Sequence, residues 1–213
     1  MNLPSAGIIS ISSSRDEYLN TDLSSIPQYD PCVLLYHCLM DLLELLSMPL
    51  TWRDGQRWKR AAELLAIWLK DNTPVAVLLR RQSETVRSGI GAVDQFIEQM
   101  TTVVCHECRE VCCRLENCRY DATDLIHLVT LGIAAPVYSE GLSDQGPCRY
   151  LASWGCTMAR TERPFRCTWH FCGALVSHMA QKPQKAVRSF SIRFQEIQAI
   201  RQEMMALLLE SIR

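Results

Sequence analysis

Nine of the eleven cysteines of this 213-residue chain fall between Cys105 and Cys172. The stretch opens as C-H-E-C-R-E-V-C-C-R-L-E-N-C, and a second group of cysteines follows after a spacer. A hydrophobic core has no need of thiols in such numbers, because Ala or Val fills similar space. Thiolates bind zinc ions and iron–sulfur clusters, and both accept four of them. The clustering therefore predicts a metal centre.

The spacing of the cysteines indicates which of them can bind the same metal ion. Two residues separate Cys105 from Cys108, so both sulfurs can reach one ion. Adjacent side chains diverge in a regular helix, so Cys112 and Cys113 favour a turn, a multi-iron cluster or two neighbouring metal ions. The predicted metal ligands are Cys105, Cys108, Cys112, Cys113, Cys148, Cys156, Cys167 and Cys172.

Three cysteines are not expected to bind the metal. Cys118 is expected to lie farther from it than Cys172, which the short R-C-T-W-H-F-C segment keeps close to Cys167. Cys32 and Cys38 fall on a predicted apolar helix, where buried thiols are common.

The cysteine motifs resemble those of the YkgJ-type zinc- or iron-chelating family. The likeness rests on C-x2-C-x3-C-C, an Asp-Leu-Ile helix at Asp124, and the segments G-P-C-R-Y-L, G-C-T-M and E-R-P-F-R-C, all within residues 105–172. The resemblance implies that every predicted ligand except Cys172 binds metal, and it matches Arg163 and Pro164 to the family's Arg-Pro pair. The chain has three residues before its adjacent cysteines where the family has two.

Side chains around the cysteines can support a metal centre. Seven Arg and no Lys lie within residues 105–172, and guanidinium groups can offset the charge of bound thiolates. Trp154 and Trp169 could shield the centre from water or form a small core. His106 and His170 are the nitrogens within ligand spacing, and we expect them at the surface or behind the ligands.

Composition excludes several function classes. The formal net charge of −1 disfavours a dedicated nucleic-acid binder, which usually carries a strongly basic face. The first residues lack the features of a secretion signal, and no apolar run is long enough to span a membrane. A cytoplasmic location, where thiols stay reduced, is therefore expected. The sequence also lacks H-E-x-x-H, G-x-S-x-G and phosphate-binding glycine motifs.

Three functions remain for such a centre. An iron–sulfur centre with a redox or sensory role is favoured by the adjacent cysteines and by the number of thiolates. The alternative is a structural zinc module that supports a surface for a protein partner. The third is a metal-containing, methyltransferase-like enzyme, because the resemblance extends to flagellin lysine methylases. An apolar pocket beside the metal would distinguish an enzyme from a binding module.

The elements that must position the cysteines are helices. We predict a mainly α fold, a helical bundle that carries an irregular cysteine-rich metal-binding insertion. Its parts are a flexible arm at 1–29, a helical scaffold at 30–104, the insertion at 105–172 and a long C-terminal helix within 173–213. In the scaffold, a capping box of Thr51 and Asp54 begins one helix, and Pro74 begins the next. Gly89 and Gly91 weaken that helix and make a break near them plausible.

The last two long helices are expected to pack together. Apolar side chains recur at helical spacing on both, from Ile90 to Met100 and from Phe190 to Leu208, with Arg201 between apolar positions. Metal binding would hold the end of the first helix near the start of the second, so we expect an antiparallel pair with a core separate from the insertion. The second stripe could instead be a coiled-coil seam of a homodimer.

Overall fold

The computed structural model describes residues 40–46, 54–105, 108, 112–136, 146–153 and 155–212. Over these residues the predicted mainly α fold is confirmed. The helices are α2 (Gly55–Asp71), α3 (Thr73–Val104), α4 (Ala122–Thr130), α5 (Arg166–Trp169), α6 (Gly173–Met179) and α7 (Gln184–Ile212). Residues 40–46 form a further helical segment. The predicted arm at 1–29 lies outside the described residues, as do Cys32 and Cys38.

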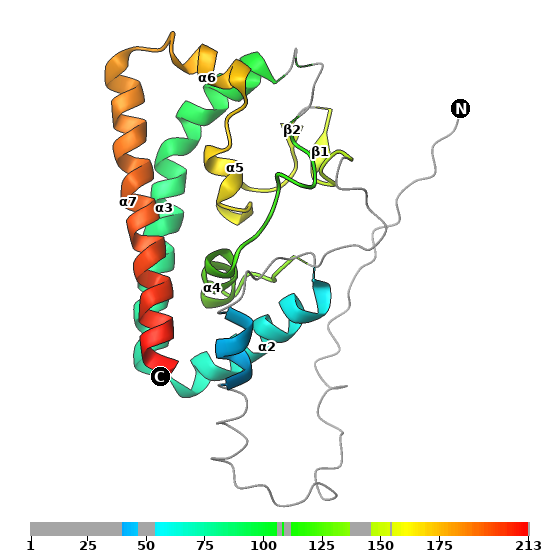
Figure 1. Ribbon diagram of the computed structural model, residues 1–213. Coiled ribbons are helices and arrows are strands. Elements are labelled where there is room, and N and C mark those ends of the chain that lie inside the picture. Colours follow the sequence, from blue (N-terminus) through cyan, green and yellow to red (C-terminus); the bar gives the residue numbers. More distant parts are fainter. Residues whose placement is uncertain are drawn as a thin grey trace, which may run out of the picture.

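Irregular chain and short elements fill the cysteine segment between α3 and α6. The strands β1 (Leu151–Ala152) and β2 (Gly155–Cys156) pair antiparallel, and the 3-10 turn η2 (Arg160–Glu162) follows them. Figure 1 places β1, β2 and α5 beside the upper half of α3, on the side away from α7, while α4 lies lower, near α2. The cysteines therefore lie against one face of the long helical pair.

The helices α3 and α7 lie side by side along most of their length (Figure 1). Gly89 approaches Ile197, while the ring of Phe96 stacks on that of Phe190 with 5.0 Å between centroids. The later residue of α3, Phe96, meets the earlier residue of α7, Phe190, so the two helices run in opposite directions. The predicted antiparallel packing is confirmed. The apolar stripe of α7 is buried within the chain, so a coiled-coil seam with a second copy would need side chains that already pack internally.

A glycine allows this close approach. A Cβ atom at Gly89 would stand 2.7 Å from Cγ1 of Ile197, whereas one at Gly91 would meet nothing within 4 Å. The helix α3 runs unbroken from Thr73 to Val104, so the expected break is absent. Gly89 is explained by the proximity of α7, and packing against α7 offsets its low helix propensity.

Side-chain caps begin two of the shorter helices. Asp54 is itself the N-cap of α2 and accepts a hydrogen bond from the amide of Arg57. The predicted capping box, in which Asp54 would lie three residues after the N-cap, is therefore wrong, and Thr51 lies outside the described residues. In α4 the carboxylate of Asp121 accepts from the amide of Asp124, and that of Asp124 accepts from the amide of Asp121. Gly132 ends α4 at a φ of 70°, where a residue without Cβ is favoured.

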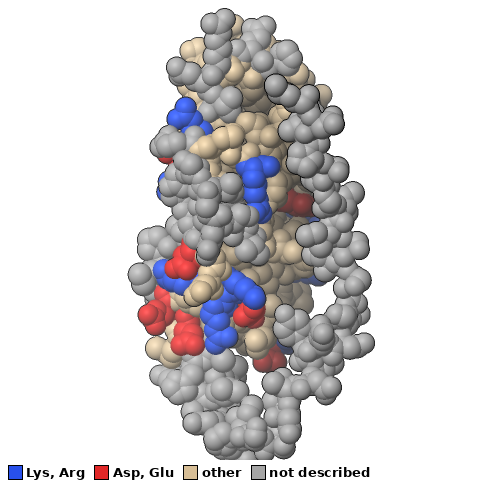
Figure 2. Space-filling view, turned by 90° about the vertical axis from the view of Figure 1, so that its right-hand side faces the viewer, with Lys and Arg blue, Asp and Glu red and all other residues tan. Residues whose placement is uncertain are grey.

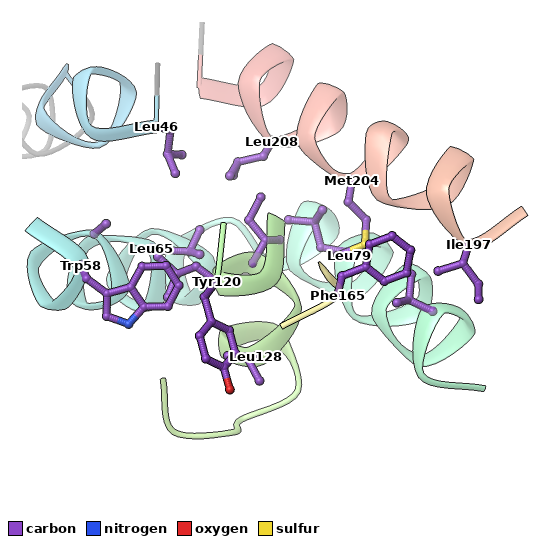
Figure 3. Packing of buried hydrophobic residues seen from close by; sticks show 14 of the residues in the cluster. Leu46, Trp58, Leu65, Leu79, Tyr120, Leu128, Phe165, Ile197, Met204 and Leu208 are labelled. Atoms are coloured by element: carbon purple, nitrogen blue, oxygen red, sulfur yellow. The ribbon is translucent and has the colours of Figure 1, made fainter. Parts of the chain in front are cut away.

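One hydrophobic core joins the helices to the cysteine segment. Figure 3 shows Tyr120 between Trp58 and Leu128. The ring centroids of Trp58 and Tyr120 are 6.0 Å apart. Phe165, from the turn before α5, lies in the same cluster as Ile197 of α7. The expected separation between a bundle core and the insertion is therefore wrong. Large apolar residues of the segment had no other surface against which to be buried.

Candidate metal centre

A cavity of about 560 Å³ lies between the end of α3 and the cysteine segment, and all nine described cysteines line it. None of these nine cysteines forms a disulfide. Cys105 ends α3, Cys156 lies in β2, Cys167 in α5, and Cys172 is the N-cap of α6. The eight predicted ligands thus reach one cavity from four different elements and the irregular chain between them.

Backbone pairing joins the two sequence groups of cysteines. The amide of Cys148 donates to the carbonyl of Cys113 at 2.8 Å, and the amide of Leu115 donates to the carbonyl of Gly146 at 3.1 Å. Arg114 and Pro147 form an antiparallel bridge between these bonds. The chain on either side of the spacer is therefore held in register beside the cavity.

Four thiols gather at the end of α3 and form what we call the first thiol group: Cys105, Cys108, Cys112 and Cys172. The Cys112 thiol is hydrogen-bonded to Cys113 and to Cys172. Burial raises the pKa of Cys105, the charges of the other three members of the group add to this effect, and the result is a pKa of about 11. The pKa of Cys112 is also raised, chiefly by its hydrogen bond with Cys113.

Four more thiols form what we call the second thiol group: Cys118, Cys148, Cys156 and Cys167. The Cys118 thiol is hydrogen-bonded to both Cys148 and Cys167, and it lines the same cavity as Cys172. The bond with Cys148 lowers the pKa of Cys118, but the bond with Cys167 and burial raise it to about 12. The pKa of Cys148 is raised, first by its hydrogen bond with Cys118 and then by burial.

Cys113 lies between these two groups. It is hydrogen-bonded to Cys112, which lowers the pKa of Cys113, and it interacts electrostatically with Cys118, Cys105 and Cys148. Most of the shifted thiols resist ionisation because of burial and of their hydrogen bonds with one another, and repulsion between neighbouring thiolates adds to this. A metal cation would reverse this effect, and binding would release protons.

The thiols stand in contacting pairs and chains in this structure. Among the residues that it describes, no three or more His, Cys, Asp or Glu side chains surround one point as metal ligands would. The donor set nevertheless suits zinc or iron–sulfur chemistry, because soft thiolates are the ligands that both prefer. The cavity wall between the thiols is largely apolar and includes Ile97, Met158 and Leu175.

Of the other residues that we predicted near the metal, some line the cavity and others do not. His170 lines the cavity, and burial lowers its pKa, whereas His106 and Trp154 lie outside the described residues. Trp169 is 42% exposed and stacks against the guanidinium of Arg166, so it does not shield the cavity from water.

Asp124 and Arg201 hold the turn before Cys167, and sequence reasoning missed both. The carboxylate oxygen Oδ1 of Asp124 accepts hydrogen bonds from Arg201 at 2.8 Å and from the amide of Phe165 at 3.1 Å. Arg201 also lies 4.3 Å from the centre of the Phe165 ring and binds the carboxylate of Asp121. The available signal was one Arg inside an apolar stripe, which predicts a buried ion pair with an acidic residue of a packed neighbour.

Arg160 fastens the next part of the segment to α3. Its buried guanidinium forms ion pairs with Asp94 and Glu98, both more than two-fifths exposed at the side chain. Nearby, Nε of Arg163 donates to the carbonyl of Met158 at 2.9 Å. These arginines hold the chain between Cys156 and Cys167, which adds a positioning role to the charge compensation expected from the sequence.

Charge on the exposed surface gives no single-sign field over the face shown in Figure 2. There, Lys and Arg side chains alternate with Asp and Glu across the described surface. This agrees with the near-neutral net charge.

None of the helices in the described ranges is long and apolar enough to cross a bilayer. No protein-family model, curated protein or solved structure matches the chain.

Proposed function

We propose that this protein binds a metal centre through the thiolates that line the cavity beside α3, and that the centre is an iron–sulfur cluster with a redox or sensory role. The observation that carries the proposal is the convergence of nine cysteine thiols on one cavity from four elements and their connecting chain. The likeness of the motifs to the YkgJ-type family points the same way.

The size of the cavity favours a multi-iron cluster over one structural zinc ion. A tetrahedral zinc with Zn–S bonds of about 2.3 Å occupies a sphere of about 50 Å³. The cavity holds about 560 Å³, which is roughly ten times that volume. A cluster of several iron and sulfide ions fills more of this space, and the additional thiols become ligands instead of unused neighbours.

An enzyme remains the second candidate because of the apolar wall. Cavities of about 300–1,000 Å³ hold small molecules, and this one lies in that range. Space that remains in the cavity after the metal has bound would hold a substrate, as a methyltransferase-like enzyme requires. In an electron-transfer protein the cluster and its ligands would fill the cavity instead.

Anaerobic purification followed by metal analysis and visible spectroscopy tests the proposal. We expect a brown protein that contains iron and acid-labile sulfide, with a broad visible band that bleaches when dithionite reduces the cluster irons. A colourless protein with stoichiometric zinc and no iron would replace the cluster by the structural zinc module. A protein without either metal would refute the metal centre itself.

Cysteine substitutions then test the ligands. We expect metal content to fall when Ser replaces any of six cysteines, namely Cys105, Cys108, Cys113, Cys148, Cys156 and Cys167. The matched controls are Cys32→Ser and Cys38→Ser, which make the same chemical change outside the cysteine segment and should keep full metal content. Equal loss in the controls and in Cys148→Ser would show that the ligand assignment is wrong.

A further inference from the structure

We propose that the thiols form two adjacent metal centres in one cavity, one at each thiol group, with Cys113 between them. This inference rests on the proposed metal-binding function and adds the number of centres and their ligands. It also assigns a ligand role to Cys118, which the motif does not include. Each thiol group contains four cysteines, and four thiolates complete either a tetrahedral zinc site or an iron–sulfur cluster.

The second thiol group depends on Cys118. This buried thiol is hydrogen-bonded to Cys148 and to Cys167, and the charge of Cys156 also acts on it. The hairpin of β1 and β2 begins three residues after Cys148 and brings Cys156 back opposite Leu151. The thiols of this group therefore come from three separate stretches of chain that line the same cavity.

The first thiol group is assembled in a different way. Cys105 and Cys108 are a chelating pair at the end of α3, and the amide of Cys108 donates to the carbonyl of Cys105 at 3.3 Å. Cys172, at the start of α6, reaches this group through its hydrogen bond with Cys112. The two groups thus share no helix and no strand.

The adjacent cysteines mark the boundary between the groups. Cys112 contacts Cys172 of the first group. Cys113 interacts with Cys118 and Cys148 of the second, and its carbonyl accepts from the amide of Cys148. Because the thiols of Cys112 and Cys113 also contact each other, the two proposed centres would be adjacent. Cys113 is placed to bridge the two metals or to replace a ligand at either.

A zinc titration measures the number of metal sites on the unmodified chain. After removal of the native metal under anaerobic, reducing conditions, the full-length protein is titrated with Zn²⁺, and bound zinc is measured together with the loss of free thiols. We expect two equivalents. One equivalent or no bound zinc would overturn the two-centre inference, while the proposed function is decided separately by the iron and sulfide content of the native protein.

Paired substitutions then locate the sites. We expect Cys105→Ser/Cys108→Ser and Cys118→Ser/Cys148→Ser to bind one equivalent each, half the wild-type amount, because each leaves one thiol group intact. The control Cys38→Ser should bind two. If either paired variant keeps the helical circular dichroism of the wild type but binds no zinc, the thiols form a single shared centre. Two equivalents on Cys118→Ser/Cys148→Ser would remove the second thiol group from the assignment.

Discussion

Replacing Arg201 by Met should destabilise the fold far more than an ordinary loss of a surface charge. The guanidinium is 7% exposed and lies between the carboxylates of Asp121 and Asp124. Met fills a similar volume, so the substitution removes the charge and the hydrogen bonds while it leaves most of the packing. The carboxylate of Asp124, which is 5% exposed, would then have no cation.

The expected cost comes mainly from Asp124. Removing one partner of a buried ion pair costs about 3–5 kcal/mol, because the other charge stays buried without compensation. The pair with Asp121 adds little, since that carboxylate is 62% exposed and exposed pairs contribute about 0–1 kcal/mol. We therefore expect Arg201→Met to lower the free energy of unfolding by about 3–5 kcal/mol at neutral pH.

The cost should also depend on pH. Burial raises the pKa of Asp124 from 3.8 to about 6, and the charge of Arg201 opposes that rise. Between these values the native chain binds more protons at Asp124 than the unfolded chain, so stability falls as pH rises through this window. Without Arg201 the pKa of Asp124 rises further and the window extends upward. The loss of stability should be smaller at about pH 5 than at about pH 8.

Urea unfolding followed by circular dichroism measures both effects. The matched control is Arg193→Met on the same helix, where Arg193 and Glu196 form a 3.0 Å pair and both are more than half exposed. The control should cost less than about 1 kcal/mol at either pH. The reasoning fails if Arg201→Met costs no more than Arg193→Met, or if its cost does not grow with pH.

Two further predictions follow from the packing of the helices and from the shared core. Gly91→Ala should stabilise the protein by about 0.5–1 kcal/mol, because the new Cβ meets nothing and helix propensity improves. Gly89→Ala should be less stable than Gly91→Ala by about 1–3 kcal/mol in urea unfolding, because its Cβ would displace Ile197; equal stabilities would contradict the close approach. Metal removal by a chelator should lower the midpoint of one cooperative thermal transition, since the cysteine segment and the helices share a core. Two separate transitions would show that the segment unfolds independently.

The helical class was available from the sequence, and so were eight of the nine cysteines that line the cavity. Apolar residues at helical spacing indicated α3 and α7 and the faces on which they pack, because burial of such stripes drives helix packing. The clustered cysteines likewise pointed to one region of chain, because ligand spacing is a local property. The N-cap of α4 is also a local feature, because the carboxylate of Asp121 accepts from the amide of Asp124 three residues away.

The relations between distant residues were decided by the tertiary structure. Cys118 joins Cys148 and Cys167 only because the chain on both sides of the spacer pairs through Cys113, and no motif spacing encodes that register. In the same way, Gly89 marks the approach of α7 and not a break in α3. Local sequence determines which elements form and which side chains can do chemistry, since propensity and periodicity act over a few residues. Which of those side chains meet depends on how the shared core is filled, and that is a property of the whole chain.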